Sequence, residues 1–391
     1  MLTMVGVQPI EDQTRTRFGK YSLTRRLAEG GMATLYLATA DGPGGFSKPC
    51  VVKRIRAPFS SSQRFRDMLG QEARVAALLN HPNIAQVFDY GEIDGECYLT
   101  MEYVEGVALD QIFQLLQREQ RRLPLPTVIF IGLTIADALA HVHDGVQING
   151  VRRNIVHRDV SPSNILVATS GVVKLTDFGI VKLLESSGAT EAGVVKGKYG
   201  YMSPEQLLGR DIDGQTDVFA LGTVLIELLT GQSLFKRRDI AATITAVLGA
   251  HVPHLHELYS DITSEVDEIL RRAIARRKED RYPSARAFHT ELSALAGILD
   301  MSHATADLAG LVRQLSSEAT TLDPRGRVPS SISGGSSRPA AYSMTPTPSF
   351  GEVLPIPEDL EEEGYGLVIW VALITTVVVA SVIVWILMLA R

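Results

Sequence analysis

The chain has 391 residues, of which 45% are hydrophobic and 21% charged, so most of it can bury a core. Its formal net charge of -6 argues against general nucleic-acid binding, which requires a basic surface. The two cysteines, Cys50 and Cys97, are too few for a disulfide framework, so the folded part suits a reducing compartment.

The first part of the chain predicts a small sheet with one helix. The opening stretch, "MLTMVGVQPIEDQ", lacks a basic region followed by an apolar run, so no secretory signal is expected there. Residues 21–27 and 35–39 are typical of strands around a glycine turn. The segments that follow predict a strand, a helix and a strand in turn: "PCVVKRI", "RFRDMLGQEARVAALLN" and "ECYLTMEYV".

The patterns after "VEG" are mainly helical. Apolar residues recur at helical spacing in segments that we expect to be helices: 109–120, 126–143, 220–230, 239–248, 264–277, 284–299 and an amphipathic segment at 303–319. The sequence therefore predicts an α+β protein with a small β-rich lobe and a larger helical lobe. The crevice between two such lobes is the expected ligand site.

The C-terminal end differs in composition from the rest. Residues 320–366 are rich in Pro, Ser and Gly, which is typical of a flexible linker. Residues 367–390 are uncharged, with Thr375, Thr376 and Ser381 as the polar interruptions. A bilayer core needs about 20 apolar residues in a helix, so this segment predicts one transmembrane helix. The alternative is a buried core helix, but such helices rarely run this long without charge.

Several residues have side chains suited to nucleotide chemistry. Gly30 and Gly31 form a turn in which backbone N–H groups can approach phosphates, although a plain hairpin turn is the simpler interpretation. Lys53 in a strand and Glu72 on the next helix would ordinarily be surface residues.

In "NIVHRDVSPSNILV", Asp159 and Asn164 stand five residues apart in a loop between strand-like flanks. A carboxylate there can accept a proton, and an amide oxygen can bind Mg²⁺. Asp177 in "VVKLTDFGI" adds a second carboxylate for the metal.

These segments, in this order, resemble the protein kinase family over residues 18–299. The stretches "EGGMATLYLA", "HRDVSPSN" and "KYGYMSPEQ" are most similar to bacterial serine/threonine kinases of the eukaryotic type, including those of myxobacteria. The resemblance implies the two-lobed kinase fold, ATP as cosubstrate, and Mg²⁺ or Mn²⁺ as the metal.

The resemblance also implies a role for each matching residue. Asp159 would orient and deprotonate the substrate hydroxyl, while Asn164 and Asp177 would hold the metal. Lys53 would contact the α- and β-phosphates and pair with Glu72. ATP would further contact the glycine-rich loop, the gatekeeper Met101 and the hinge from Glu102 to Val104; the loop comprises Leu27, Ala28, Glu29, Gly30, Gly31, Met32, Ala33, Thr34 and Leu35.

Two scaffold roles follow from the same resemblance. Glu205 would form a buried ion pair with Arg281, which closes the activation segment against the large lobe. Asp217 would support the backbone of the catalytic loop.

The sequence departs from the family pattern in two places. Ala28 and Ala33 replace two glycines of the glycine-rich loop, and we expect a modest effect on ATP affinity. Ser161 replaces the Lys that normally neutralises the transferred phosphoryl group, while Lys198 replaces the Thr that normally contacts that Lys. We hypothesise that the two positions have exchanged functions; the alternative is that Lys198 points into solvent.

The domain organisation expected from the sequence has five parts: an N-terminal extension (1–17), a kinase domain (18–300), a helical extension (301–319), a linker (320–366) and a transmembrane helix (367–390). ATP chemistry places the kinase domain in the cytoplasm, on a single-pass anchor in the cell membrane, although Arg391 taken alone would favour a cytoplasmic C-terminus. Arg158 before the catalytic Asp is typical of control by phosphorylation. We expect this at one or more of Ser186, Ser187 and Thr190.

The function expected is an active, membrane-anchored serine/threonine kinase that phosphorylates proteins and itself, with no nucleic-acid partner. A homodimer that autophosphorylates in trans is a candidate assembly. The main alternative is a pseudokinase that acts as a nucleotide-binding scaffold. Tyrosine specificity is less expected, because Ser163 stands where tyrosine kinases tend to carry Arg.

Overall fold

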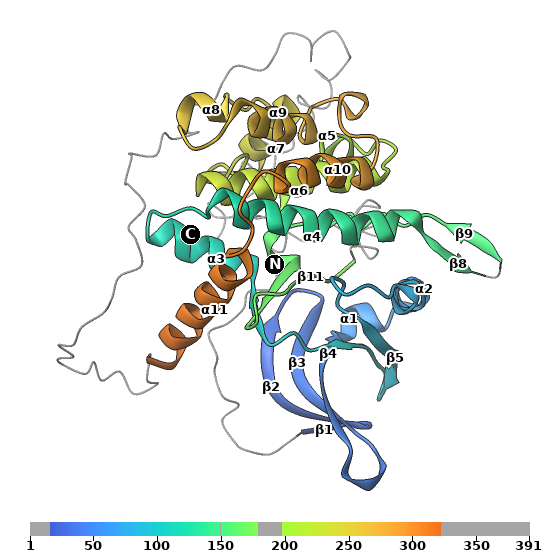
Figure 1. Ribbon diagram of the computed structural model, residues 1–391. Helices are drawn as coiled ribbons and strands as arrows, with labels where there is room; N and C mark the ends of the chain where they lie inside the picture. The colour runs from blue at the N-terminus through green and yellow to red at the C-terminus, as the bar shows by residue number, and fades with distance from the viewer. Residues whose placement is uncertain (1–15, 149, 179–197, 322–391) are drawn as a thin grey trace, which may run out of the picture.

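The computed structural model describes residues 16–148, 150–178 and 198–321. They form a small lobe of strands below a larger lobe of helices in the view of Figure 1, as the sequence predicts. The expected linker, the transmembrane helix at 367–390 and the three candidate phosphorylation sites lie outside the described residues.

The small lobe contains a six-stranded antiparallel sheet in the order β1-β2-β3-β4-β6-β5. Its strands are β1 (Thr16–Phe18), β2 (Tyr21–Glu29), β3 (Ala33–Asp41), β4 (Ser47–Ile55), β5 (Val87–Ile93) and β6 (Glu96–Glu102). A 3₁₀ turn, η1 (Pro43–Gly45), links β3 to β4. The register pairs Leu35 with Lys53, so Lys53 lies next to the glycine-rich loop.

Two helices follow β4, α1 (Ala57–Ser60) and α2 (Gln63–Leu78). The Ser62 side chain caps α2 by accepting a hydrogen bond from the Phe65 N–H, which satisfies a donor that the first turn leaves free. Phe65 and Leu69 of this helix pack with Ile55 and Cys97 of the sheet. This apolar contact fixes α2 against the sheet.

The large lobe is built around α4 (Leu125–Asp144) and α6 (Gly214–Thr230), whose apolar residues share one core. Among the described residues α4 is the one helix long and apolar enough to cross a membrane, but most of it is buried inside the lobe. The other helices of the lobe are α3 (Leu109–Arg118), α5 (Pro204–Leu207), α7 (Ile240–Gly249), α8 (Leu255–Leu258), α9 (Ser264–Ala273), α10 (Ala285–Ala296) and α11 (Ala304–Thr321).

Short strands and turns connect the lobes and carry the catalytic segments. They are β7 (Gly106–Ala108), β10 (Ile165–Ala168) and β11 (Val173–Leu175), which form a sheet in the order β11-β10-β7, the hairpin β8 (Val146–Ile148) and β9 (Val151–Arg153), and the 3₁₀ turns η2 (Pro162–Asn164), η5 (Tyr199–Tyr201) and η6 (Lys278–Asp280). Asn164 directly precedes β10 and Asp177 follows β11, so the pairing of these two strands holds both residues at the same end of the hairpin.

Three predicted helix boundaries were wrong, and one of them is the end of the helix expected to reach residue 299, which stops at Ala296. The helix expected from residue 220 begins at Gly214, because Asp213 caps it by accepting from the Gln215 N–H. The helix expected to reach residue 277 ends at Ala273. The guanidinium of Arg281 donates to the carbonyl oxygens of Ala275 and Arg276. These hydrogen bonds hold the chain after Ala273 in a non-helical conformation.

The amphipathic segment predicted near residues 303–319 is confirmed as a helix, α11. It lies beside α3 in Figure 1 and buries Leu308 and Val312 in the core of the large lobe. Thr127 donates to Asp307 at 2.9 Å, and Arg118 pairs with Glu318 at 2.6 Å. The large lobe is therefore extended by one docked helix.

Candidate active site

The active-site lysine and a carboxylate from the other lobe meet across the crevice. Lys53 Nζ lies 2.8 Å from Asp177 Oδ1, and both side chains are largely shielded from solvent. Glu72 belongs to α2, but its side chain lies outside what the structure describes. The predicted Lys53–Glu72 contact is therefore untested.

The glycine-rich loop spans the end of β2, the turn and the start of β3. The N–H of Gly30 donates to the carbonyl of Ala33 at 2.9 Å, which closes the turn. Ala28 and Ala33, the residues that replace glycines, are 2% and 5% exposed. Ala33 packs with Ile55 and Phe65, so its methyl group belongs to the core of the small lobe.

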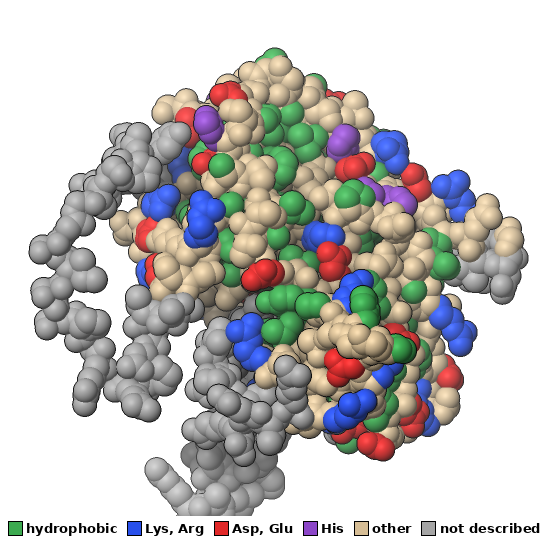
Figure 2. All heavy atoms as spheres, turned by 60° about the horizontal axis from the view of Figure 1, so that its bottom comes forward, with side chains coloured by type: hydrophobic (Ala, Val, Ile, Leu, Met, Phe, Trp, Pro, Cys, Tyr) green, Lys and Arg blue, Asp and Glu red, His purple; other side chains and the backbone are tan. Residues whose placement is uncertain are grey.

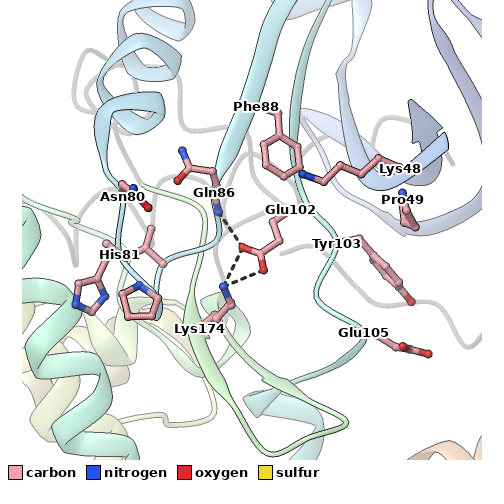
Figure 3. Close-up of a pocket in the computed structure, with 12 residues that line it drawn as sticks. Lys48, Pro49, Asn80, His81, Gln86, Phe88, Glu102, Tyr103, Glu105 and Lys174 are labelled. Carbon is pink, nitrogen blue, oxygen red and sulfur yellow. Dashed lines mark hydrogen bonds and ion pairs between the residues drawn. The ribbon is translucent and has the colours of Figure 1, made fainter. Parts of the chain in front are cut away.

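The predicted hinge lies between β6 and β7. Met101 is buried and accepts a hydrogen bond on its sulfur from Thr176 at 3.8 Å. The carboxylate of Glu102 contacts Lys174 at 2.8 Å and the N–H of Gln86 at 3.2 Å, as Figure 3 shows. Val104 lies in the link that follows. The Glu102 side chain is thus engaged with the protein, and its backbone N–H donates to the Gln86 carbonyl at 2.8 Å.

An open cavity of about 620 Å³ lies beside this hinge. Its lining includes Glu102, Lys174, Phe88 and Lys48, with the Lys48 ammonium 4.1 Å from the centre of the Phe88 ring (Figure 3). Lys53 and the catalytic-loop residues do not line it. We therefore distinguish it from the phosphate-binding side of the crevice.

Asp159 and Asn164 lie together in the catalytic loop. The Asn164 amide nitrogen donates to the backbone oxygen and to Oδ2 of Asp159, each at 2.8 Å. Both amide hydrogens are used in this way, so the Asn164 side-chain oxygen is the atom left for a metal. An amide oxygen and the Asp177 carboxylate are hard ligands, which fit Mg²⁺ or Mn²⁺.

A buried histidine holds the catalytic loop in shape. The N–H of Asp159 donates to Nδ1 of His157, whose Nε2 lies 3.2 Å from the Thr176 carbonyl. Nδ1 must therefore be the acceptor, and Nε2 carries the proton. Burial lowers the pKa of His157, which keeps the ring neutral in this tautomer.

Asp217 supports the same loop, as the resemblance predicts. Its carboxylate accepts from the N–H groups of His157 and Arg158 at 2.8 Å each, and His143 lies 2.8 Å away. Burial alone would raise the pKa of Asp217, but these contacts outweigh it and the pKa is lowered. The two N–H bonds fix Arg158 at a φ of 67°, a strained value for a residue with a side chain.

Lys198 points into the site rather than into solvent. Its ammonium forms an ion pair with Oδ2 of Asp159. Asp110 of α3 lies near enough to interact with the same charge: burial raises the pKa of Asp110, and Lys198 opposes that rise. The hydroxyl of Ser161 pairs with that of Ser163 at 3.0 Å. A cation therefore lies at the Asp159 carboxylate although position 161 carries none.

The predicted ion pair between Glu205 and Arg281 is confirmed. The two guanidinium nitrogens lie 2.7 and 2.9 Å from the two carboxylate oxygens, and both side chains are buried. Burial would raise the pKa of Glu205, but the fork of Arg281 outweighs it and the pKa is lowered. This pair joins α5 to the segment after η6.

Four contributors were not predicted from the sequence: His143, His157, Asp110 and Lys174. His157 was quoted as part of the catalytic stretch but was given no role. Lys174 stands in the quoted stretch "VVKLTDFGI", and Asp110 and His143 stand in predicted helices, but none of them was given a role; His143 is 74 residues from its partner Asp217. Their roles depend on contacts that only the fold creates.

The order and arrangement of these residues fit the protein kinase family, and comparisons with known proteins agree. The family model "Protein kinase domain" matches residues 21–292, so the chain belongs to the protein kinase family.

The chain is 41% identical over 271 residues to "Tyrosine-protein kinase MasK" of Myxococcus xanthus, a match that covers 69% of this chain and 42% of that one. It is 33% identical over 270 residues to "Serine/threonine-protein kinase PknF" of Mycobacterium tuberculosis, covering 68% of this chain and 54% of that one. The chain thus spans about half the length of these curated relatives.

The kinase domain of Mycobacterium tuberculosis PknI, solved by crystallography, has a similar fold. The TM-score is 0.54 at 28% identity, covering 72% of this chain and 97% of that one. The two-lobed kinase fold expected from the sequence is therefore confirmed.

Proposed function

We propose that this kinase is active and transfers the γ-phosphoryl group of ATP to serine or threonine hydroxyls of proteins. The observation that supports this most directly is the Lys198–Asp159 ion pair, which supplies a cation beside Asp159 where position 161 carries none. A pseudokinase is the alternative, but the residues expected to handle nucleotide, metal and proton are all present, namely Lys53, Glu72, Asp159, Asn164 and Asp177.

In this proposal Asp159 orients the acceptor hydroxyl and takes its proton as the bond to phosphorus forms. Lys53 holds the α- and β-phosphates. The metal, held by Asn164 and Asp177, would supply positive charge to the phosphates. His157 and Asp217 act through Asp159, because they fix the backbone that positions its carboxylate.

Lys198 would neutralise charge that develops on the transferred phosphoryl group. A lysine ammonium on a flexible stem acts as a point charge, so it can serve from a different backbone position than the usual one. Preorganised charge of this kind is worth about 10²–10³ in kcat. The ion pair with Asp159 would keep the ammonium in the site when ATP is absent.

Serine/threonine specificity is favoured over tyrosine specificity on two grounds. Position 163, two beyond Ser161, carries a small hydroxyl that is bonded to Ser161 instead of an Arg. PknF is named a serine/threonine kinase, whereas MasK is named a tyrosine kinase, so tyrosine transfer is the second candidate.

The test is phosphoamino-acid analysis. The purified full chain would be incubated with radiolabelled ATP, Mg²⁺ and a mixed protein substrate, with Asp159→Asn as the control. We expect labelled phosphoserine and phosphothreonine that disappear in the control. Labelled phosphotyrosine alone would favour the second candidate, and no transfer by the parent chain would favour the pseudokinase.

The placement of the enzyme is a further part of the proposal. We propose a cytoplasmic kinase domain at residues 18–300, followed by the helical extension at 301–319 and a linker at 320–366 that leads to a membrane anchor at 367–390, because the last segment is uncharged and long enough to span a bilayer. Protein substrates and a homodimer that autophosphorylates in trans belong to the same proposal. Arg158 would pair with a phosphate on Ser186, Ser187 or Thr190.

A further inference from the structure

A cluster of metal-binding side chains lies on the large lobe, separate from the active site. It consists of His254, His256 and Asp267, and we call it the histidine–aspartate cluster. One potential ligand atom from each residue lies within 4.8 Å of those from the other two. His254 is the residue before α8, His256 lies within α8, and Asp267 lies in the first turn of α9.

The local backbone makes the two rings converge on one carboxylate. His254 has an extended conformation, with φ of -67° and ψ of 114°, and the helical turn begins immediately after it. The two ring centres are 5.3 Å apart, with the planes at 65° to each other. Nδ1 of His254 lies 3.1 Å and Nδ1 of His256 2.7 Å from Asp267 Oδ2.

The carboxylate of Asp267 is unusual in its surroundings. Asp267 is 0% exposed, and its Oδ1 is buried with no hydrogen-bond partner among the described residues. Both histidines instead contact the other oxygen. A buried oxygen without a hydrogen-bond partner is unfavourable. A role in hydrogen bonding alone would be served by one histidine on each oxygen, whereas here both histidines contact the same oxygen.

The donor set favours a transition metal over Mg²⁺. Imidazole nitrogens suit Zn²⁺ and its neighbours, and a third ligand from a carboxylate is common, whereas Mg²⁺ prefers oxygen ligands alone. Ligands about 2.1 Å from a tetrahedral ion are about 3.4 Å from one another. The observed distances from the two Nδ1 atoms to Asp267 Oδ2, 3.1 and 2.7 Å, are slightly shorter, so each nitrogen needs to move from that oxygen by less than 1 Å.

The site is also accessible. The side chains of His254 and His256 are 51% and 33% exposed, so an ion can enter and a water molecule can take the fourth position. Arg271 lies on α9, as Asp267 does, and its guanidinium donates to the carbonyl of Val252. That contact holds the segment before α8 to α9 and keeps the histidines near Asp267.

We propose that the histidine–aspartate cluster binds one Zn²⁺-class ion through the two Nδ1 atoms and the Asp267 carboxylate. The ion takes the place of the two ring protons and satisfies the buried carboxylate. It clamps α8 to α9 and stabilises this end of the large lobe. This site is distinct from the Mg²⁺ site of the kinase reaction, since no residue is shared.

The test uses the full chain, freed of metal with a chelator and kept in excess Mg²⁺ and ATP. Co²⁺ would be titrated as a spectroscopic probe, and Zn²⁺ would then be added to displace it. We expect one site with the visible absorption of low-symmetry Co²⁺, and a rise of several degrees in the unfolding temperature with Zn²⁺. His256→Ala should weaken binding at least tenfold and remove the thermal shift.

Two controls separate this site from others. His303→Ala changes an exposed histidine outside the cluster and should bind as the parent chain does. Asp159→Asn alters the active site and should also bind normally. Asp267→Asn should lose the site; if that variant fails to fold, His256→Ala decides. Absence of Co²⁺ absorption in the parent chain, or equal binding by His256→Ala, would overturn the proposal.

Discussion

Glu227 is a buried carboxyl group whose ionisation should make the stability of the large lobe depend on pH. It is 2% exposed, and its oxygens accept from the hydroxyl of Tyr201 at 2.6 Å and from the N–H of Leu234 at 2.8 Å. Burial raises the pKa of Glu227 from its ordinary 4.5 to about 7, against the opposing effect of these two donors. The folded state therefore keeps the proton at a pH where the unfolded chain has released it.

The sign and size of the effect follow from linkage. Between about pH 4.5 and 7 the folded state binds more protons than the unfolded state, so the free energy of unfolding falls as pH rises. A difference of about 2.5 pKa units corresponds to about 3 kcal/mol across that window. Above pH 7 the full destabilisation is present, and below pH 4.5 it is absent.

The variant Glu227→Gln removes the ionisation and keeps the shape of the side chain. Urea unfolding of parent and variant at pH 5, 6, 7 and 8 would give the difference in free energy at each pH. We expect that difference to shift by about 3 kcal/mol in favour of Gln between pH 5 and 8. Glu279→Gln changes an exposed residue and serves as control: its free energy of unfolding should change with pH as that of the parent does. The same pH dependence in the parent and in Glu227→Gln would refute the reasoning.

Two other substitutions test the packing and ion pairing around the site. Arg281→Met leaves the Glu205 carboxylate buried without its partner, which should destabilise the protein by about 3–5 kcal/mol in urea unfolding. The double variant Arg281→Met with Glu205→Gln should be more stable than Arg281→Met alone. A loss below about 1 kcal/mol in Arg281→Met would contradict the buried ion pair. Ala33→Gly removes a buried methyl group and should cost about 1 kcal/mol of stability while the KM for ATP stays within about twofold. A tenfold fall in that KM would mean that the methyl obstructs phosphate binding.

The sequence predicted the two lobes and most helices because their apolar residues recur at regular spacing. It also placed Asp159, Asn164 and Asp177, since these stand in short segments of the chain with a recognisable order. The structure brings Asp159 and Asn164 into contact and sets Asp177 against Lys53. Local spacing is sufficient information where the functional residues are close in sequence.

Contacts between distant segments could not be predicted in the same way. Nothing in the neighbourhood of His143 indicates that it faces Asp217, 74 residues away, and the convergence of His254 and His256 on Asp267 depends on how α8 packs against α9. The placement of Lys198 lies between these two cases. Ser161 and Lys198 both depart from the family pattern, and together they suggested that Lys198 reaches into the site, where the structure pairs it with Asp159. The helix boundaries were wrong where side chains such as Asp213 and Arg281 satisfy backbone groups at the ends.

Surface charge gives a consistent view of the partners. Figure 2 shows acidic and basic side chains interspersed on the face where the β-rich lobe comes forward, with no extended basic area. The net charge of -6 has the same implication. The mixed charges on this face fit the protein substrates proposed above.

The central claim is that an active kinase carries its catalytic cation at Lys198 instead of at position 161. The most direct measurement is kcat for protein phosphorylation by four full chains: the parent, Lys198→Met, the double variant Ser161→Lys with Lys198→Thr, and Asp159→Asn. We predict that Lys198→Met loses about 10²–10³ in kcat, that the double variant recovers to within about tenfold of the parent, and that Asp159→Asn is inactive. If Lys198→Met stays within about twofold of an active parent, the cation at Lys198 does not serve the reaction and the claim is contradicted.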